Sequence, residues 1–238
     1  GPAISGRIRW PDRSWRAAGC DAGGFFLKQS TVRTLNFKMK TIKSLAVVAL
    51  LGMAGSVWAQ ADEERAKKIV GGVCFVCHGA EGESSSEVFP RLAGQHWEYT
   101  AKQLENFKSG KRKSETMKPQ SEELTPAEMK ALGVFFEKKK ASANTPTDSE
   151  ILAVGRYIFS RGNQFSGLPS CASCHGAKGY GTSQLPRLAG QHPRYVEDQL
   201  KQFNKRERTN DNAVMHTVAS KLTELEAHAV AEYIATLD

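Results

Sequence analysis

Apolar side chains recur at helical spacing through the chain after residue 61, and no stretch shows the two-residue alternation typical of a strand. This spacing predicts helices over Asp62–Val70 and Asp148–Ser160. The apolar side of the second helix consists of Ile151, Val154, Ile158 and Phe159. Gly155 lies within this helix at a cost in stability relative to alanine, and either a close helix crossing or a tolerated glycine explains it.

Spacing and capping residues predict two further pairs of helices. One pair carries the same pattern twice, in Tyr99, Gln103, Leu104 and Phe107 and then in Tyr195, Gln199, Leu200 and Phe203. The other pair begins at the capping boxes Thr125-Pro-Ala-Glu128 and Thr223-Glu-Leu-Glu226, the first with proline at the first helical position. Because every predicted element is helical, the sequence predicts an all-α fold.

Two pentapeptides with the pattern Cys-x-x-Cys-His lie at 74–78 and 171–175. This pattern is typical of covalent haem c attachment. The two thiols form thioether bonds with the porphyrin, and the adjacent imidazole ligates the iron from the proximal side. Paired cysteines at this spacing also bind zinc or form thiol redox pairs, but two copies, each followed by a second shared motif, favour haem. The predicted binding residues are Cys74, Cys77, Cys171 and Cys174 for covalent attachment, and His78 and His175 for the two irons.

The second shared motif indicates an internal duplication. Residues 89–96 are Phe-Pro-Arg-Leu-Ala-Gly-Gln-His, and residues 185–192 are Leu-Pro-Arg-Leu-Ala-Gly-Gln-His. These copies are 96 residues apart, and the histidines of the two Cys-x-x-Cys-His motifs are 97 residues apart. A nearly constant offset with small insertions or deletions is typical of an internal duplication. We therefore expect two domains, 62–140 and 148–238, joined by a polar, proline-containing linker at 141–147.

Residues 39–61 have the organisation of a secretory signal peptide. Met39 and two lysines precede the apolar run Leu45–Ala54, and small residues around Ala59 suit a signal peptidase. A transmembrane anchor is the alternative, but the apolar run is shorter than the roughly 20 residues that a bilayer requires. Export to the periplasm also agrees with covalent haem, which bacteria attach outside the cytoplasmic membrane.

Residues 1–38 show no helical or strand period and precede a start site at Met39. We expect them to be upstream sequence or a cloning remnant that is absent from the mature protein. Cys20 lies in this segment without a partner, because the other four cysteines belong to the haem motifs.

The formal charge of +8 comes mainly from the first 59 residues, which hold nine Lys/Arg and two Asp. The remainder has 24 basic and 23 acidic residues and is therefore close to neutral. Nucleic-acid binding needs a basic stripe on the folded part of a protein, so we expect no nucleic-acid partner.

Two methionines are the predicted sixth ligands of the irons. Met117 lies 39 residues after His78, and Met215 lies 40 residues after His175, both in polar stretches that are expected to be irregular. Met129 instead falls inside a capped helix, where core packing explains it. A thioether in the sixth position leaves no open site for a substrate, so the expected chemistry is outer-sphere electron transfer.

Histidines are the competing sixth ligands. His96 and His192 recur at equivalent positions, but each lies at the start of a helix, where a cap or a contact with a haem propionate explains it as well. His216 directly follows Met215 and has no counterpart in the first copy. His228 is expected on the surface of the last helix.

Taken together, the Cys-x-x-Cys-His motifs, the Pro-Arg-Leu-Ala-Gly-Gln-His segments and the two spaced methionines resemble the dihaem cytochrome c4 family over roughly Asp62 to Asp238. The resemblance implies two tandem class I cytochrome c domains, each around one covalent haem c, with the haem edges near the interface. It also implies a periplasmic protein that carries electrons from a quinol-oxidising complex toward a terminal oxidase, and it leaves peripheral membrane association open.

The resemblance also implies roles for residues near each haem. In class I domains a proline carbonyl accepts a hydrogen bond from the proximal histidine, and this role falls to Pro90 and Pro186. Arg91 and Arg187 are expected to face propionates or solvent. The residues that follow the two methionines differ, so the two haems are expected to differ in potential.

An electron carrier, and not an enzyme, is the leading hypothesis. One alternative is the cytochrome subunit of an oxidoreductase, because the same domain serves as carrier or as fixed relay. Another is a dihaem peroxidase, which needs one iron with an exchangeable sixth position. A purely structural haem module is the weakest hypothesis, since two haems in tandem serve little purpose without electron transport.

Overall fold

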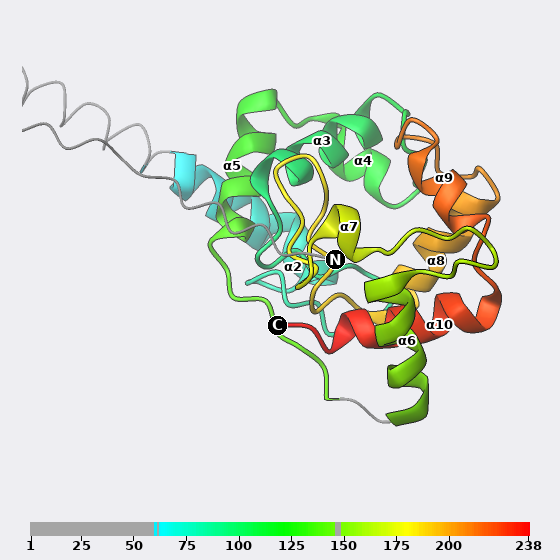
Figure 1. Cartoon of the computed structure of the whole chain (residues 1–238). Coiled ribbons are helices and arrows are strands. Elements are labelled where there is room, and N and C mark those ends of the chain that lie inside the picture. The colour runs from blue at the N-terminus through cyan, green and yellow to red at the C-terminus, as the bar shows by residue number, and fades with distance from the viewer. Residues whose placement is uncertain (1–59, 61, 146–148) are drawn as a thin grey trace, which may run out of the picture. The chain divides into compact units, whose positions relative to one another are not determined.

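The computed structural model describes residue 60 and residues 62–145 and 149–238, all of which lie in the structural unit Gly52–Asp238. The predicted signal peptide, apart from Gln60, and the segment 1–38 with Cys20 lie outside the described residues. Within the described part the regular elements are helices, and a single isolated β-bridge joins Asn163 to Leu168. The predicted all-α fold is confirmed (Figure 1).

The first repeat begins with a helix over 62–69 that runs without a break into the haem motif. Its elements are η1, a π-helix (Val70–Cys74), α2 (Phe75–His78), α3 (Trp97–Lys108), α4 (Met117–Glu122) and α5 (Pro126–Glu137). The predicted helix over Asp62–Val70 is therefore confirmed but too short, because the helical path continues through the motif to His78.

The second repeat has the same order of elements with one difference. Its helices are α6 (Ser149–Arg161), α7 (Ala172–His175), α8 (Pro193–Asn204), α9 (Val214–Ala219) and α10 (Glu224–Ala235). The helix predicted over Asp148–Ser160 corresponds to α6. A turn containing the β-bridge separates α6 from α7, whereas the first repeat has no such interruption.

Both predicted capping boxes are present. The Thr125 hydroxyl accepts a hydrogen bond from the Glu128 N–H at 3.3 Å, and the Glu128 carboxylate accepts one from the Thr125 N–H at 3.0 Å. Thr223 and Glu226 exchange the corresponding bonds at 3.2 and 2.9 Å. These reciprocal bonds satisfy N–H groups that a helix start otherwise leaves unpaired, so they fix where α5 and α10 begin.

Each repeat has its own apolar core. Helix α3 packs on α5 in the first repeat, and α6 packs on α10 in the second. Met129 and Phe136 are almost fully buried in the first core, which confirms the packing role predicted for Met129. At Gly155 a Cβ atom would overlap the carbonyl of Ala229. The glycine therefore permits a close crossing of α6 and α10.

The repeated Gln-His segment joins the two repeats. The Gln95 side chain donates to the Arg187 carbonyl and accepts from the Arg187 N–H, both at 2.9 Å. Gln191 makes the mirror-image pair of bonds with Arg91, at 2.9 and 2.8 Å. Each glutamine thus exchanges two hydrogen bonds with a peptide of the other repeat, as paired residues do in an antiparallel sheet. The interface has approximate two-fold symmetry.

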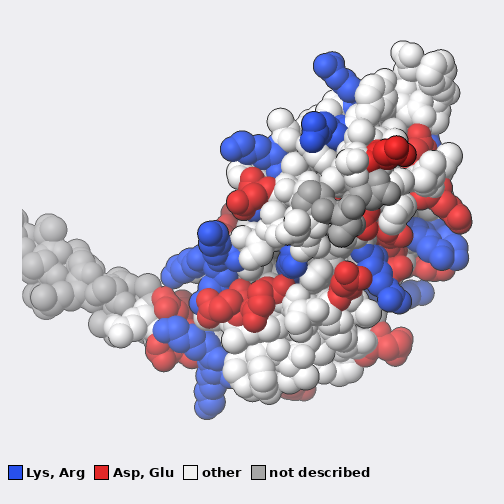
Figure 2. Space-filling view, turned by 90° about the horizontal axis from the view of Figure 1, so that it is seen from below, with Lys and Arg blue, Asp and Glu red and all other residues white. Residues whose placement is uncertain are grey.

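None of the helices in the described residues is long and apolar enough to span a bilayer. On the face drawn in Figure 2, lysine and arginine side chains are interspersed with aspartate and glutamate. That face therefore has no basic stripe of the kind that nucleic-acid binding needs.

Candidate haem-binding sites

Each Cys-x-x-Cys-His motif ends at a glycine that reverses the chain. Gly79 and Gly176 follow the two histidines with φ of 78° and 81°, a conformation that other residues rarely adopt. None of the four motif cysteines forms a disulfide with another described residue. Burial raises the pKa of the Cys171 thiol to about 11, and it raises the pKa of Cys74 as well. Before haem is attached, these two thiols are therefore protonated at neutral pH.

The predicted proline carbonyls contact the two motif histidines. His78 Nδ1 lies 2.8 Å from the Pro90 carbonyl oxygen, and His175 Nδ1 lies 3.0 Å from that of Pro186. A carbonyl oxygen can only accept a hydrogen bond, so Nδ1 carries the proton in both rings. Burial lowers the pKa of both imidazoles and favours their neutral form. The Nε2 lone pair of each ring is then free to bind a metal.

A cavity of about 680 Å³ lies against the first motif. Its wall includes Cys74, Cys77 and His78 together with Met117. Large apolar side chains also line it, namely Leu92, Leu104, Phe107, Leu132 and Phe136. This set fits haem c, because it combines two thiols for the porphyrin, a neutral imidazole and a thioether for the iron, and an apolar wall for the macrocycle.

Neither candidate methionine lies in an irregular stretch, which corrects the prediction. Met117 is the first residue of α4, and Met215 is the second residue of α9. The Met117 N–H donates to the Ser114 hydroxyl at 3.1 Å, whereas the Met215 N–H donates to the Asp211 carboxylate at 2.7 Å. Both helices have only six residues and several polar positions, so apolar periodicity does not reveal them.

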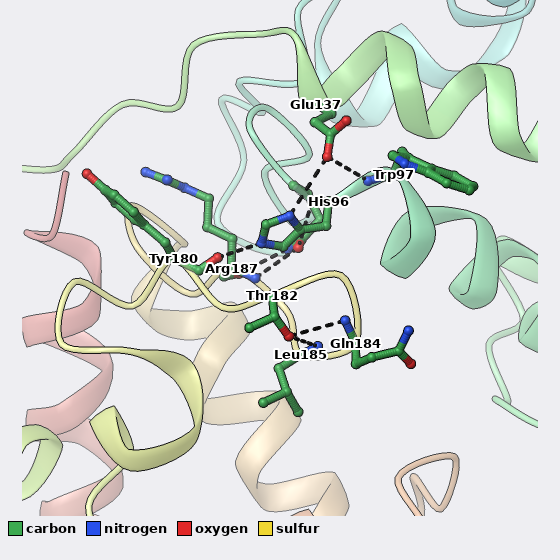
Figure 3. A network of polar contacts seen from close by, with 9 residues as sticks. His96, Trp97, Glu137, Tyr180, Thr182, Gln184, Leu185 and Arg187 are labelled. Carbon is green, nitrogen blue, oxygen red and sulfur yellow. Dashed lines mark hydrogen bonds and ion pairs between the residues drawn. The ribbon is translucent and has the colours of Figure 1, made fainter. Parts of the chain in front are cut away.

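The recurring histidines that competed for the irons bridge the two repeats. His96 Nε2 donates to the Tyr180 carbonyl at 2.8 Å, and His192 Nε2 donates to the Ser84 carbonyl at 2.9 Å. Figure 3 shows His96 between Tyr180 of the second repeat and Glu137 of its own. Both histidines occupy N-cap positions, but neither side chain caps its helix. The two histidines are therefore at the predicted cap positions, but their side chains bind the other repeat instead of capping the helices.

The two histidines near the C-terminus also have protein partners. His216 Nδ1 lies 3.0 Å from the Phe203 carbonyl oxygen. His228 Nδ1 lies 2.8 Å from the Glu197 carboxylate at an exposed position, which agrees with the surface location predicted for His228.

The arginines of the repeated motif contact protein groups. The Arg91 guanidinium donates to the carbonyls of Ser142 and Gly190 at 2.8 and 2.6 Å. Arg187 donates to its neighbour Ala189 at 3.3 Å and lies over the ring of Tyr180 at 4.5 Å. Arg91 thus ties the first repeat to the linker and to the second repeat, and it also lines the cavity beside the first motif.

Comparison with known proteins identifies the family. The cytochrome c family model matches the chain twice, over residues 63–160 and 159–238. Cytochrome c4 of Pseudomonas aeruginosa is 34% identical over 194 residues, which are 80% of this chain and 96% of that protein. The chain belongs to the dihaem cytochrome c4 family. The crystal structure of reduced cytochrome c4 from Pseudomonas stutzeri is similar to this cytochrome with a TM-score of 0.69 and 32% identity, covering 76% of this chain and 98% of that one.

Membership in the cytochrome c4 family establishes the cofactor. The protein binds two haem c groups covalently, one in each domain, and it is an electron-transfer cytochrome. A relative from Thiomonas intermedia is named thiosulfate dehydrogenase electron acceptor. It is 34% identical over 204 residues, which are 83% of this chain and 91% of that protein. The name of that relative gives thiosulfate dehydrogenase as its electron donor.

The sequence patterns do not single out the polar residues that fill the interface. Arg112 and Arg208 lie in charged stretches after α3 and α8, where a solvated surface is the ordinary interpretation. The structure buries both, with 8% and 7% of their surface exposed. The signal that finds them is the repeat itself, because they are separated by the same 96 residues as Pro90 and Pro186.

Proposed function

We propose that this protein carries single electrons in the periplasm, from a quinol-oxidising complex toward a terminal oxidase. Each haem iron, when bound, changes between the ferric and ferrous forms and so supplies one-electron chemistry. The observation that carries the proposal is the presence of both His78 and Met117 on the wall of one cavity. With a chain ligand available for each axial position, no position at the iron is left for a substrate.

The proposal assigns each predicted site residue a role. Four cysteines would hold the haems covalently, and the irons would be bound by His78 with Met117 and by His175 with Met215. The carbonyls of Pro90 and Pro186 hold the Nδ1 protons and thereby orient the imidazoles, which tunes the basicity of the ligand. The cysteines are Cys74, Cys77, Cys171 and Cys174.

The proposed domain limits and export route remain those expected from the sequence. The domains are 62–140 and 148–238 with a linker at 141–147, and the packing of α6 on α10 supports the assignment of α6 to the second domain. A signal peptide at 39–61 would deliver the chain to the periplasm, where the haems are attached.

Electron transfer from quinol tests the proposed direction. The purified dihaem protein is mixed with membranes that contain a quinol-oxidising complex and a terminal oxidase, and quinol is added as the reductant. We expect haem reduction that depends on the quinol-oxidising complex, followed by oxygen uptake in proportion to the added cytochrome. If dithionite reduces both haems fully while quinol and membranes reduce neither, this direction of transfer is wrong.

A second candidate donor is favoured by the Thiomonas intermedia relative. In that case the protein accepts electrons from a thiosulfate dehydrogenase and not from a quinol-oxidising complex. The same dihaem protein is therefore mixed with a purified thiosulfate dehydrogenase and thiosulfate. Faster reduction in this mixture than with quinol and membranes supports the second candidate, and the reverse order supports the first.

A further inference from the structure

Ser84 lies between His78 and Pro90 in a backbone conformation that serine rarely adopts. Its φ of 41° is in the left-handed region, and only 2% of its surface is exposed. The equivalent position, 97 residues later, is Gly181 with a φ of 69°, and glycine adopts this conformation without a steric cost. A residue with a side chain stays in such a conformation only where its surroundings hold it there. The strain at Ser84 therefore points to a role for the contacts that it makes.

Two groups of Ser84 join the two ends of this loop. Its N–H donates to the His78 carbonyl at 2.8 Å, at the start of the loop. Its hydroxyl lies 2.9 Å from the Phe89 carbonyl oxygen, at the end of the loop. The same hydroxyl lies 3.0 and 3.2 Å from the carbonyl oxygens of Ser86 and Cys77, so three acceptors share one proton. Ser84 thereby sets how far apart the two ends lie.

The loop that Ser84 closes carries the acceptor for the proximal imidazole. Phe89 directly precedes Pro90, whose carbonyl accepts the hydrogen bond from His78 Nδ1 at 2.8 Å. The Phe89 ring also packs edge-on against the imidazole, with 6.2 Å between the ring centroids. A shift of Ser84 would move the Pro90 carbonyl relative to His78 Nδ1, and the strength of this bond controls how basic the imidazole is as a ligand.

A further contact of Ser84 comes from the second repeat. His192 Nε2 donates to the Ser84 carbonyl at 2.9 Å, and only 4% of the His192 surface is exposed. The preceding residue, Gln191, bonds to the peptide groups of Arg91, which directly follows Pro90. Two consecutive residues of the second repeat therefore hold the first proximal loop, at Ser84 and just beyond Pro90.

The second proximal loop reaches the same kind of proximal bond by a different closure. His96 Nε2 donates to the Tyr180 carbonyl at 2.8 Å (Figure 3). Tyr180 precedes Gly181, which has no side chain to reach the end of the loop. Backbone hydrogen bonds between Thr182 and Leu185, at 2.9 and 3.1 Å, close this loop instead. His96 thus bonds to a residue outside the closure, whereas His192 bonds to the residue that makes it.

We propose that His192 of the second repeat positions the proximal ligand of the first haem through Ser84, so that the reduction potential of this haem depends on contact between the repeats. His192 holds Ser84 in its left-handed conformation, and Ser84 in turn closes the loop. The loop then holds the Pro90 carbonyl against His78 Nδ1. His192 and Ser84 are positioning residues, since they act through the proximal bond. The inference rests on the proposed role of His78 as an iron ligand and not on any redox partner.

The test is the reduction potential of each haem in the isolated dihaem protein, measured by potentiometric titration followed by NMR. His192→Leu removes the hydrogen-bond donor, and Ser84→Ala removes the hydroxyl. We expect both to weaken the bond from His78 Nδ1 and to raise the potential of the first haem, because a less basic imidazole stabilises the ferric form less. The expected change is about threefold in the reduction equilibrium, or about 28 mV for one electron, less than the roughly tenfold effect typical of groups bonded directly to a ligand. The potential of the second haem should not change.

Further measurements distinguish positioning from a general loss of stability. Solvent exchange of the His78 Nδ1 proton in the reduced protein should be faster in both variants, whereas His192→Gln keeps a donor and should stay close to the wild type. The double variant of His192→Leu and Ser84→Ala should shift the potential no further than the larger single effect, because both residues act along one path. Additive shifts overturn the proposal.

Matched variants serve as controls. Ser85→Ala removes a hydroxyl from the exposed neighbouring position and should change neither potential. His96→Leu breaks the corresponding bond in the other direction and should leave the first haem unchanged. An unchanged first-haem potential in His192→Leu or in Ser84→Ala, or an equal shift of both haems in His192→Leu, overturns the proposal. If His192→Leu does not accumulate with both haems, Ser84→Ala decides by the same criteria.

Failure of the proposed ligand role gives a different result. The ring protons of a haem ligand lie in the ring current of the porphyrin, so the wild-type NMR signals of His78 report its ligation. Unshifted signals would remove His78 from the ligands and the inference with it. Shifted signals together with unchanged potentials in the variants would leave ligation standing and overturn the inference alone. The potentials are measured without a partner, so the quinol experiment has no bearing on them.

Discussion

The proximal side of the first haem site and that of the second are nearly the same, whereas the methionine sides differ. The His78–Pro90 and His175–Pro186 hydrogen bonds measure 2.8 and 3.0 Å. Both motifs end at a glycine with positive φ. This agreement has a chemical reason, because covalent attachment and iron ligation require the two thiols and the imidazole in a fixed arrangement.

The surroundings of Met117 and Met215, the proposed sixth ligands, are less alike in the two repeats. In the first repeat an uncharged hydroxyl, that of Ser114, accepts a hydrogen bond from the Met117 N–H. In the second, the carboxylate of Asp211 accepts from the N–H groups of Met215 and His216, at 2.7 and 3.1 Å. The repeats thus keep methionine, the proposed sixth ligand, while changing the charge next to it, which is one way for a duplicated protein to give two similar haems different potentials.

The largest expected effect is the loss of one haem. Cys174→Ser removes one thioether and should weaken or abolish attachment at the second haem only, while Cys77→Ser should do the same at the first. Mass spectrometry of the intact protein and haem quantification per chain measure this. Loss of both haems from either variant would show that the repeats do not mature independently.

The methionine side should respond unequally to removal of its hydrogen-bond acceptors. Asp211→Ala leaves three N–H groups at the start of α9, those of Ala213, Met215 and His216, without their acceptor, so we expect partial loss of Met215 ligation in the second haem. Ser114→Ala removes one neutral acceptor and should cost only about 1 kcal/mol in the first repeat. The charge-transfer band of methionine-ligated ferric haem checks both. Equal loss in the two variants contradicts the comparison.

The hydrogen bonds of Gln95 and Gln191 between the repeats should contribute equally to stability, in contrast to the two methionine sides. Gln95→Ala and Gln191→Ala each remove two hydrogen bonds to a peptide of the other repeat and one from the N–H of the following histidine. We expect each to lower the free energy of unfolding by on the order of 2 kcal/mol. Thermal unfolding of the dihaem protein measures the effect.

Gln184→Ala is the control for both bridge variants, because this glutamine is exposed and should be neutral. If only one of Gln95→Ala and Gln191→Ala lowers the free energy of unfolding, the two bridges have the same geometry but do not contribute equally to stability.

The smallest expected effect concerns acid stability of the two capping boxes. Hydrogen bonds from Thr125 and Arg65 lower the pKa of Glu128 from 4.5 to about 2. The pKa of Glu226 is also lowered, by hydrogen bonds from Thr223 and from the neutral amide of Asn163. A depressed carboxyl pKa contributes stability above about pH 4.5 that is lost as the pH falls toward 2. Glu128→Gln should remove this dependence and change stability at pH 7 by about 1 kcal/mol or less, because the group is largely screened by solvent.

Acid titration of the unfolding midpoint measures this effect, with Glu226→Gln as the counterpart in the second repeat. The pH dependence should be weaker at Glu226, whose side-chain partner is uncharged. A Glu128→Gln variant that keeps the wild-type acid profile would exclude this capping box as its source.

The sequence predicts the chemistry of the haem motifs better than it predicts the interface. The spacing of Cys-x-x-Cys-His and the capping boxes depends on neighbours within a few residues, and these features are present as expected. Gln95 and His96 form their contacts with residues more than 80 positions away, and no local pattern reveals such partners. The burial of Arg112 has no local signal, because a charged stretch after a helix normally faces solvent, and only its recurrence as Arg208 in the second repeat points to it.

The central claim is that methionine closes the sixth position at both irons, and an optical spectrum of the ferric protein tests it most directly. The weak band toward the red end reports methionine sulfur on ferric iron, and haem is quantified per chain. The account predicts two low-spin haems with this band at full intensity, and half that intensity in a Met117→His variant. A wild-type band at half intensity, or a high-spin component, would contradict it and leave one iron open to substrate or bound by two histidines.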